Sequence, residues 1–231
     1  MNMKKRMLSI VLSGAMAVST AVSAGSFSAF AVAQCVAYSG SNVNAQDYVQ
    51  WSDTVKSYLT VCDNGNYMRV QSGAIEGKLL VEYYSPDFEP LSTKLIDNEL
   101  PIFGAFYDSG NNYYVLSGQE NPKQNDSLEV FRITKYDKNW NKIKSCGLYG
   151  ANTTVPFDAG SARMTHSGDH LLVRTCHEMY KSSDGNNHQS NVTIEVDMPS
   201  MTITDSYTGV MNVDYGYVKN RRQPYSRPRP W

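Results

Sequence analysis

The sequence has little that would tie it to a known enzyme class. It contains no Gly-x-Ser-x-Gly elbow, no His-Glu-x-x-His helix, no phosphate-binding loop and no dinucleotide fingerprint. Its 4 cysteines follow no spacing typical of a metal site. No window shows the helical periodicity and capping residues that would predict a helical domain. Without these motifs no metal or cofactor is expected.

Long apolar runs are also lacking, except near the N-terminus. There, bases at positions 4–6 precede an apolar stretch over 7–22, and small-residue cleavage patterns follow at 29–33. This order predicts a secretory signal peptide over residues 1–33 and a secreted, extracellular protein. An uncleaved anchor helix is the alternative, but polar interruptions keep the stretch below the ~18–20 residues that a span needs. No later segment could span a membrane.

Basic residues are scarce in the body of the chain. Of 21 lysines and arginines, eight lie in the leader or in the last thirteen residues, which leaves 13 bases against 22 acids over 34–218. Phosphate backbones are bound by clustered bases. The acidic body therefore argues against nucleic acid as a partner.

The cysteines of an exported chain can form disulfides. Cys35 and Cys62 are the first pair to test, because both lie in the N-terminal stretch. The alternative is that the thiols, including those of Cys146 and Cys176, are simply buried.

Two kinds of turn recur in the same order along the chain. The first kind is a polar turn that runs into an apolar strand, centred on Gly65, Gly110 and Gly168, which are 45 and 58 residues apart. The second kind follows each of these after one strand pair, beginning at Tyr84, Tyr136 and Val196, which are 52 and 60 residues apart. Two independent markers in one order indicate an internal repeat.

The repeat predicts an all-β fold. Each unit has room for four strands, and the units are expected over 57–98, 102–148 and 161–209, after a lead-in over 34–56. A period of ~45–60 residues built from four strands is typical of a β-propeller blade. The prediction is an incomplete β-propeller of about three four-stranded blades, with a β-sandwich as the alternative.

The chain changes character at its end. Residues 219–231 hold three prolines and five bases and no acid, so a disordered tail is expected there. Because propellers close with four to eight blades, we interpret the chain as a fragment with a truncated or out-of-frame end; a tail made for a purpose is the alternative. The open first and last sheets would then expose edges and apolar faces, which predicts self-association.

Several stretches resemble a known group of proteins. These are residues 174–180, Asp184-Gly185, 187–189 and 216–218, which are similar to segments of secreted β-propeller proteins of low-GC Gram-positive bacteria. The resemblance covers about residues 60–218. It implies the propeller fold and assigns no catalytic residue.

Two long loops, over 117–127 and 180–190, are expected on one face of the propeller, together with residues 149–160. Loops on a rigid scaffold commonly carry binding residues. The sequence therefore predicts a binding module for a cell-surface or environmental glycan or protein. The candidate contacts are Glu120, Asn121, Tyr180, Asp184, Asn187, His188 and Gln189.

The alternative is an extracellular enzyme of the propeller type, such as a lyase, a hydrolase or a sulfotransferase. His177 or His188 would exchange protons, and Glu178 would orient the imidazole. Strand alternation weakens this hypothesis, since neighbouring residues point to opposite faces. The other two histidines, His166 and His170, are expected opposite each other across a three-residue hairpin loop as an ordinary cross-strand contact, without a metal.

Overall fold

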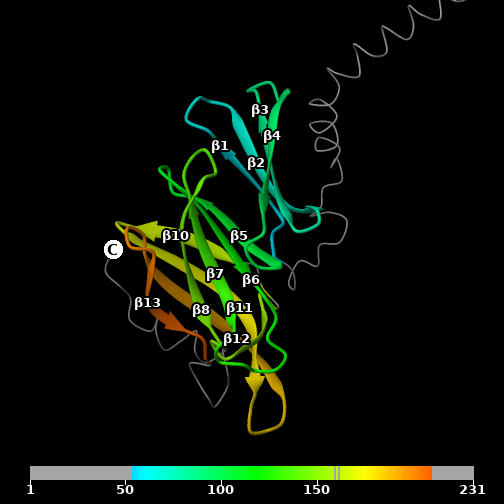
Figure 1. Ribbon diagram of the computed structural model, residues 1–231, viewed down its shortest axis with the longest axis vertical. Helices are drawn as coiled ribbons and strands as arrows, with labels where there is room; N and C mark the ends of the chain where they lie inside the picture. Colours follow the sequence, from blue (N-terminus) through cyan, green and yellow to red (C-terminus); the bar gives the residue numbers. More distant parts are fainter. Residues whose placement is uncertain (1–53, 159, 161, 210–231) are drawn as a thin grey trace, which may run out of the picture.

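The computed structural model describes residues 54–158, 160 and 162–209 (Figure 1). The predicted signal peptide, Cys35 and the basic tail lie outside these residues. The described part forms thirteen strands and no helix. It therefore contains no helix that could cross a membrane.

The strands form three antiparallel sheets in chain order. The first sheet contains β1 (Ser57–Val61), β2 (Tyr67–Ile75), β3 (Lys78–Tyr84) and β4 (Pro90–Asp97). The second contains β5 (Ile102–Asp108), β6 (Tyr113–Gly118), β7 (Glu129–Tyr136) and β8 (Lys142–Tyr149). The third contains β9 (Thr153–Pro156), β10 (Arg163–Ser167), β11 (His170–Lys181), β12 (Asn187–Asp197) and β13 (Thr202–Tyr207). These are three consecutive propeller blades, fewer than a closed ring needs, as predicted.

The first kind of repeated turn is confirmed by backbone geometry. The three aligned glycines all have positive φ, at 82° in Gly65, 89° in Gly110 and 56° in Gly168. Residues with a Cβ atom adopt such angles far less readily than glycine does. Glycine thus favours the turn by which each blade passes from its first strand to its second.

The second kind of turn places an apolar residue in the left-handed region. Phe88 has φ 63° and Trp140 has φ 65°. Each ring packs on the tyrosine that begins the second strand of its own blade, with ring centroids 4.7 Å apart for Phe88 and Tyr67 and 4.8 Å for Trp140 and Tyr113. These aromatics anchor one end of the first blade and of the second blade.

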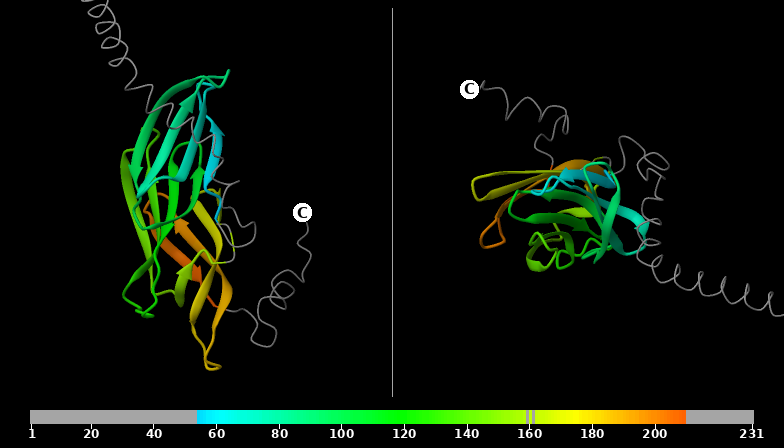
Figure 2. Two further views of the ribbon diagram at one scale, coloured as in Figure 1. Left: turned by 90° about the vertical axis from the view of Figure 1, so that its right-hand side faces the viewer. Right: turned by 90° about the horizontal axis from the view of Figure 1, so that it is seen from above.

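The second sheet is buried on both faces, because it lies between the other two (Figure 2). Along β6, Tyr113 and Val115 belong to the cluster shared with the first sheet, whereas Tyr114 and Leu116 belong to the cluster shared with the third. Strand alternation sends successive side chains to opposite faces. One strand thus contributes to two cores.

The two outer faces differ, contrary to the expectation that both would be apolar. On the first sheet, Leu59 is 62% exposed and Leu95 is 47% exposed. The outer face of the third sheet instead presents Thr165, Arg174 and Glu195, next to one partly exposed leucine, Leu172. The prediction of an apolar face was wrong for the third sheet because its outward strand positions hold polar side chains.

The third blade also has a strand that the sequence did not predict. Strand β9 pairs with the far end of β11, and β10 pairs with its near end, so the first strand of this blade is broken in two. The break follows Phe157, which has φ 64° and a buried ring. That ring approaches the backbone of Gly104 and Gly118 in the second sheet.

Candidate functional site

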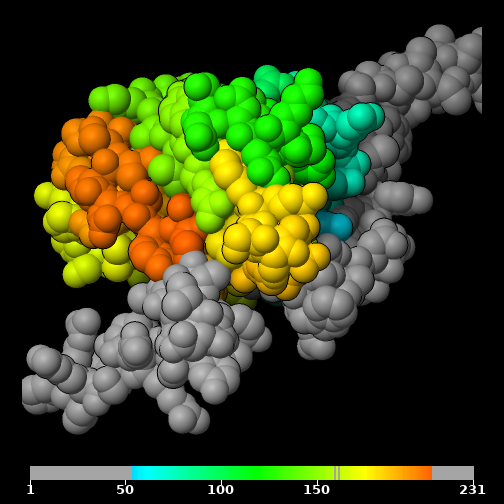
Figure 3. Space-filling view, turned by 90° about the horizontal axis from the view of Figure 1, so that it is seen from below, coloured from blue at the N-terminus to red at the C-terminus, as the bar shows by residue number. Residues whose placement is uncertain are grey.

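Strand connections gather at two opposite ends of the sheets. The loop end is formed by residues 119–128, 150–152 and 182–186, and the turn end by 109–112, 168–169 and 198–201. Seen from below, the β11–β12 hairpin (yellow) lies beside the second blade (green) at the loop end (Figure 3). The loop expected over 180–190 is only a short turn, because most of its residues extend β11 and β12 as a paired hairpin.

The structure brings two predicted contact residues together at the loop end. Asn121 is fully buried, and its Nδ2 donates to Tyr180 Oη at 2.9 Å and to the Asn125 carbonyl at 3.1 Å. Its backbone N–H donates to the Thr154 carbonyl at 2.7 Å. Asn121 therefore fastens the β6–β7 loop to the third blade, while its neighbour Glu120 is exposed.

The other candidates lie along the hairpin, and most are bonded within the chain. Asn187 Nδ2 donates to the Met179 carbonyl at 2.8 Å, and Gln189 Nε2 donates to the Asp158 carboxylate. His188 Nε2 is 2.7 Å from Asp184 Oδ2 across the hairpin tip. Hydrogen bonds from hydroxyl and backbone groups, with His188 adding to them, hold the pKa of the Asp184 carboxyl well below its usual range.

The three residues of the enzyme hypothesis do not converge. His177 points into the core, where it is fully buried and its Nδ1 lies 2.7 Å from Thr153 Oγ1. Burial lowers its pKa to about 4. Glu178 lies on the opposite face of β11 and accepts from Thr154 Oγ1 at 2.6 Å, while His188 is at the hairpin tip. This arrangement offers no shared proton-transfer site.

The part of the chain that the structure describes contains neither a disulfide nor a cluster of metal ligands. Cys62, Cys146 and Cys176 are half-buried and form no disulfide with one another. The described residues also contain no group of three potential metal ligands. Because Cys35 lies outside them, the pairing of Cys35 with Cys62 stays a prediction.

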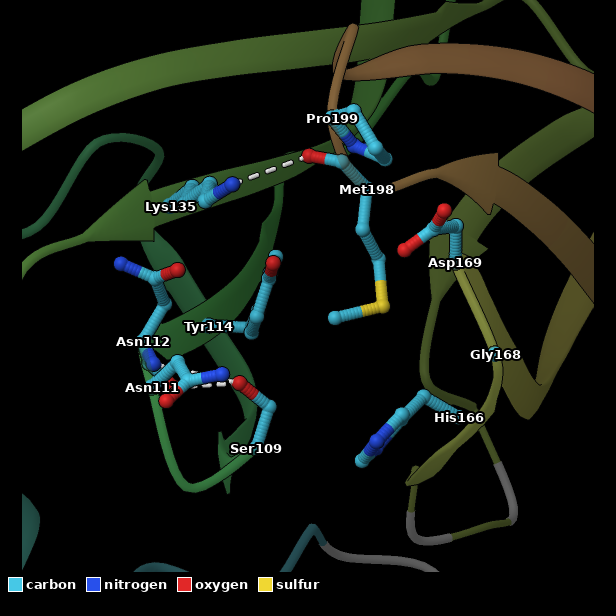
Figure 4. A pocket seen from close by; sticks show the side chains of 10 residues that line it. All are labelled: Ser109, Asn111, Asn112, Tyr114, Lys135, His166, Gly168, Asp169, Met198 and Pro199. Carbon is cyan, nitrogen blue, oxygen red and sulfur yellow. Dashed lines mark hydrogen bonds between the residues drawn. The ribbon is translucent and has the colours of Figure 1, made fainter.

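A pocket of about 300 Å³ opens at the turn end, between the second and third blades (Figure 4). Its walls come from Ser109 and residues 111–112, from residues 168–169, from His166 and Lys135, and from the Met198-Pro199 pair. Its volume is at the lower limit of ligand pockets. The pocket fits a ligand of about one small ring.

Tyr114 lines this pocket, and its hydroxyl is buried. Its side chain is fully buried among the pocket-lining residues, and its Oη has no hydrogen-bond partner among the described residues. Burial raises its pKa to about 12, so the group is a neutral phenol at physiological pH. Buried polar groups are nearly always hydrogen-bonded, whereas the Tyr114 hydroxyl is free to form a hydrogen bond with a ligand.

Three further polar groups line the same pocket. Lys135 Nζ donates to the Met198 carbonyl at 3.0 Å and forms no ion pair with a described residue. His166 Nδ1 lies 2.7 Å from Tyr107 Oη. The carboxylate of Asp169 has no hydrogen bond or ion pair to the rest of the described chain. The pocket thus holds a cation, an anion, an imidazole and a phenol within a small volume.

The position of His166 corrects the expected histidine pair. Ser167 pairs directly with His170, so the hairpin loop has only two residues, 168–169. The two histidines are therefore not opposite each other: His166 lines the pocket, and His170 Nδ1 lies 2.7 Å from Glu195 Oε1. No pattern in the sequence predicted the pocket, although the repeated turns mark its rim.

Comparisons with known proteins give no family. No family model matches the chain, and no curated protein matches it. The chain is similar to a solved ACO/RPE65 chimera, with 11% identity, a TM-score of 0.42 and coverage of 67% of this chain and 38% of that one. It is also similar to a GH43 β-1,3-galactosidase with galactodeoxynojirimycin, with 11% identity, a TM-score of 0.37 and coverage of 66% and 45%.

A third similar structure is an exo-β-1,3-galactanase from Clostridium thermocellum, with 6% identity, a TM-score of 0.37 and coverage of 70% of this chain and 39% of that one. The chain therefore spans less than half the length of each of these proteins. The blade assignment rests on the sheet topology.

Proposed function

We propose that this protein is an exported binding module that takes the end of a cell-surface or environmental glycan into the pocket between its second and third blades. The buried Tyr114 hydroxyl, which has no partner among the described residues, is the observation that carries the proposal. An unsatisfied buried polar group costs about 1–3 kcal/mol. A ligand that bonds to this hydroxyl recovers that cost.

Sugar hydroxyls suit the remaining groups of the pocket. Each hydroxyl both donates and accepts, so one ring can donate to Asp169 and accept from Lys135. The loop end offers less, because Asn121 and Asn187 use their amides within the chain. Of the candidates there, Glu120, Asp184 and His188 stay predicted contacts for a larger ligand.

Tyr114→Phe tests the proposal, since it keeps the ring and removes only the hydroxyl. Binding of the full-length chain to a glycan array should be lost, while the midpoint of thermal unfolding stays the same or rises. Tyr149→Phe, at a ring that is 57% exposed, is the control and should bind normally. Unchanged glycan binding in Tyr114→Phe would contradict the proposal, as would a clear loss of stability.

Export is tested separately from binding. Residues 1–33 should direct the chain out of the cell and be absent from the mature product, which N-terminal sequencing of the secreted protein checks. Retention of the intact chain in the cytoplasm would refute this part of the proposal.

A further inference from the structure

The pocket carries two opposite charges that do not neutralise each other. Lys135 extends from β7 on one wall, and Asp169 extends from the β10–β11 turn on the other (Figure 4). The two form no ion pair with each other or with another described residue. A ligand that enters the pocket meets a positive wall and a negative wall.

The positive wall is available to an anion. Lys135 Nζ uses one of its three N–H bonds on the Met198 carbonyl at 3.0 Å. The Asp197 carboxylate accepts hydrogen bonds from the Ser200 hydroxyl and from the Ser200 backbone N–H at 2.8 Å, and these bonds lower its pKa more than the charges of His170 and Lys135 do. The lysine therefore keeps donors that no carboxylate of the described chain uses.

The negative wall is suited to hydroxyl groups. Asp169 is exposed, so pairing it with an ammonium ion would contribute only about 0–1 kcal/mol. Hydrogen bonds from hydroxyls to a carboxylate do not depend on that pairing, and Tyr114 adds a buried bonding group. The imidazole of His166, whose Nδ1 is taken by Tyr107, adds another through Nε2.

We propose that the ligand is a sugar residue that carries a carboxylate, such as a terminal hexuronate. Its carboxylate contacts Lys135, and its ring hydroxyls contact Asp169 and Tyr114. This inference rests on the proposed function and adds its specificity. Charge-assisted hydrogen bonds are stronger than neutral ones, so the carboxylate should decide which sugar the pocket selects.

Isothermal titration of the full-length chain with three probes tests the inference: methyl glucuronide, methyl glucoside and glycine. The glucuronide should bind about tenfold more tightly than the neutral glucoside, as expected for a hydrogen bond to a charged group. Lys135→Met should abolish that preference while binding of the glucoside persists.

Lys144→Met is a matched control. Lys144 Nζ donates to the Ser200 carbonyl at 2.6 Å, so both lysines fasten the same β12–β13 turn, but Lys144 does not line the pocket. This variant should keep the preference for the glucuronide. Loss of the preference in Lys144→Met would show that the turn, and not the charge of Lys135, is responsible.

The outcomes separate this inference from the proposed function. Equal binding of glucuronide and glucoside would overturn the acidic-sugar inference and leave a glycan-binding module. Binding of glycine alone would overturn the sugar class in favour of a zwitterion that bridges the two charges. Binding of none of the probes, together with a blank glycan array, would refute both.

Discussion

The ring of Phe157 occupies the space that a side chain on Gly104 would need: a Cβ on that glycine would lie 2.4 Å from Phe157 Cζ. A Cβ on Gly118 would lie 2.8 Å from Cε2 of the same ring. The connection between the second and third blades is therefore held by close contact between one aromatic ring and the backbone of the second sheet.

Gly104→Ala should lower the free energy of unfolding by about 1–3 kcal/mol, because the added methyl overpacks a site that cannot expand. Urea denaturation measures the change. Phe157→Ala leaves a cavity and should cost about 3–5 kcal/mol. In the double variant the methyl fills part of that cavity, so the loss of unfolding free energy should be smaller than the sum of the two single losses. A loss equal to that sum would show that the two residues do not compete for space.

Trp140 links the first two blades through a hydrogen bond from its Nε1 to Tyr83 Oη at 3.1 Å. Trp140→Phe and Tyr83→Phe each remove this bond, and Phe88 shows that phenylalanine fits the equivalent turn. A double-mutant cycle from thermal unfolding should give a coupling of about 1 kcal/mol. Coupling near zero would mean that the bond contributes nothing.

Glu82 is a buried acid of the first sheet, with a side chain that is 1% exposed and paired with Arg69. The Tyr84 hydroxyl also donates to it. Arg69→Met removes the cation that faces a buried carboxylate, which should cost about 3–5 kcal/mol, whereas Arg69→Met combined with Glu82→Met should cost less. Chemical denaturation at neutral pH checks both variants; a double variant less stable than Arg69→Met would contradict the expectation.

His177 should make stability fall in mild acid. Its pKa drops from 6.5 to about 4 on folding because burial disfavours the charged ring. Above pH 6.5 both states are neutral; between about pH 6.5 and 4 the unfolded chain takes up a proton that the folded chain does not, so stability is lost as the pH falls. The loss should approach about 3 kcal/mol.

Denaturation at pH 7.5 and at pH 4.5 measures this loss. His177→Gln should be less stable at pH 7.5 but should lose less on acidification. His166→Gln is the control, because this imidazole is exposed and bonds to the Tyr107 hydroxyl rather than to a carboxylate, and this variant should lose as much stability on acidification as the unmodified protein. An unchanged acid dependence in His177→Gln would assign the effect to other groups.

The exposed leucines of the first sheet predict self-association. Leu59 and Leu95 are 62% and 47% exposed on one face, and such faces tend to be covered by a partner. Leu95→Lys should shift sedimentation of the full-length chain towards the monomer, whereas Leu172→Lys on the polar third sheet should not. A monomer at all concentrations without any substitution would contradict the prediction.

The sequence predicts the blades well because the signals are local. A glycine at Gly65, Gly110 and Gly168 marks one turn, and an apolar residue at Phe88 and Trp140 marks the other. The predicted loop over 180–190 was too long at both ends, because residues 180–181 extend β11 and residues 187–190 begin β12. The polar Asn187 to Gln189 segment resembles a turn until its partner strand is known. Tertiary pairing here overrides local preference.

The candidate site was not predictable in the same way. Lys135 and Asp169 come from different blades, and only the packing of two sheets brings them to one pocket. The orphan hydroxyl of Tyr114 is likewise a property of packing, because its neighbours on β6 look equally apolar in the sequence. What the sequence does show is a set of polar residues at turns, without the distances between them.

The burial of both faces of β6 has a consequence for how the chain reaches its native strand alignment. In a sheet with one solvent-exposed face, a shift of the strand register by one residue would expose apolar side chains to water and is therefore unfavourable. Here a slip would only move Tyr113 and Tyr114 from one buried core to the other. Polarity cannot correct such a slip, so the tight turn at Gly110, closed by its N–H donating to Asp108 Oδ1 at 2.8 Å, must set the alignment of the middle sheet.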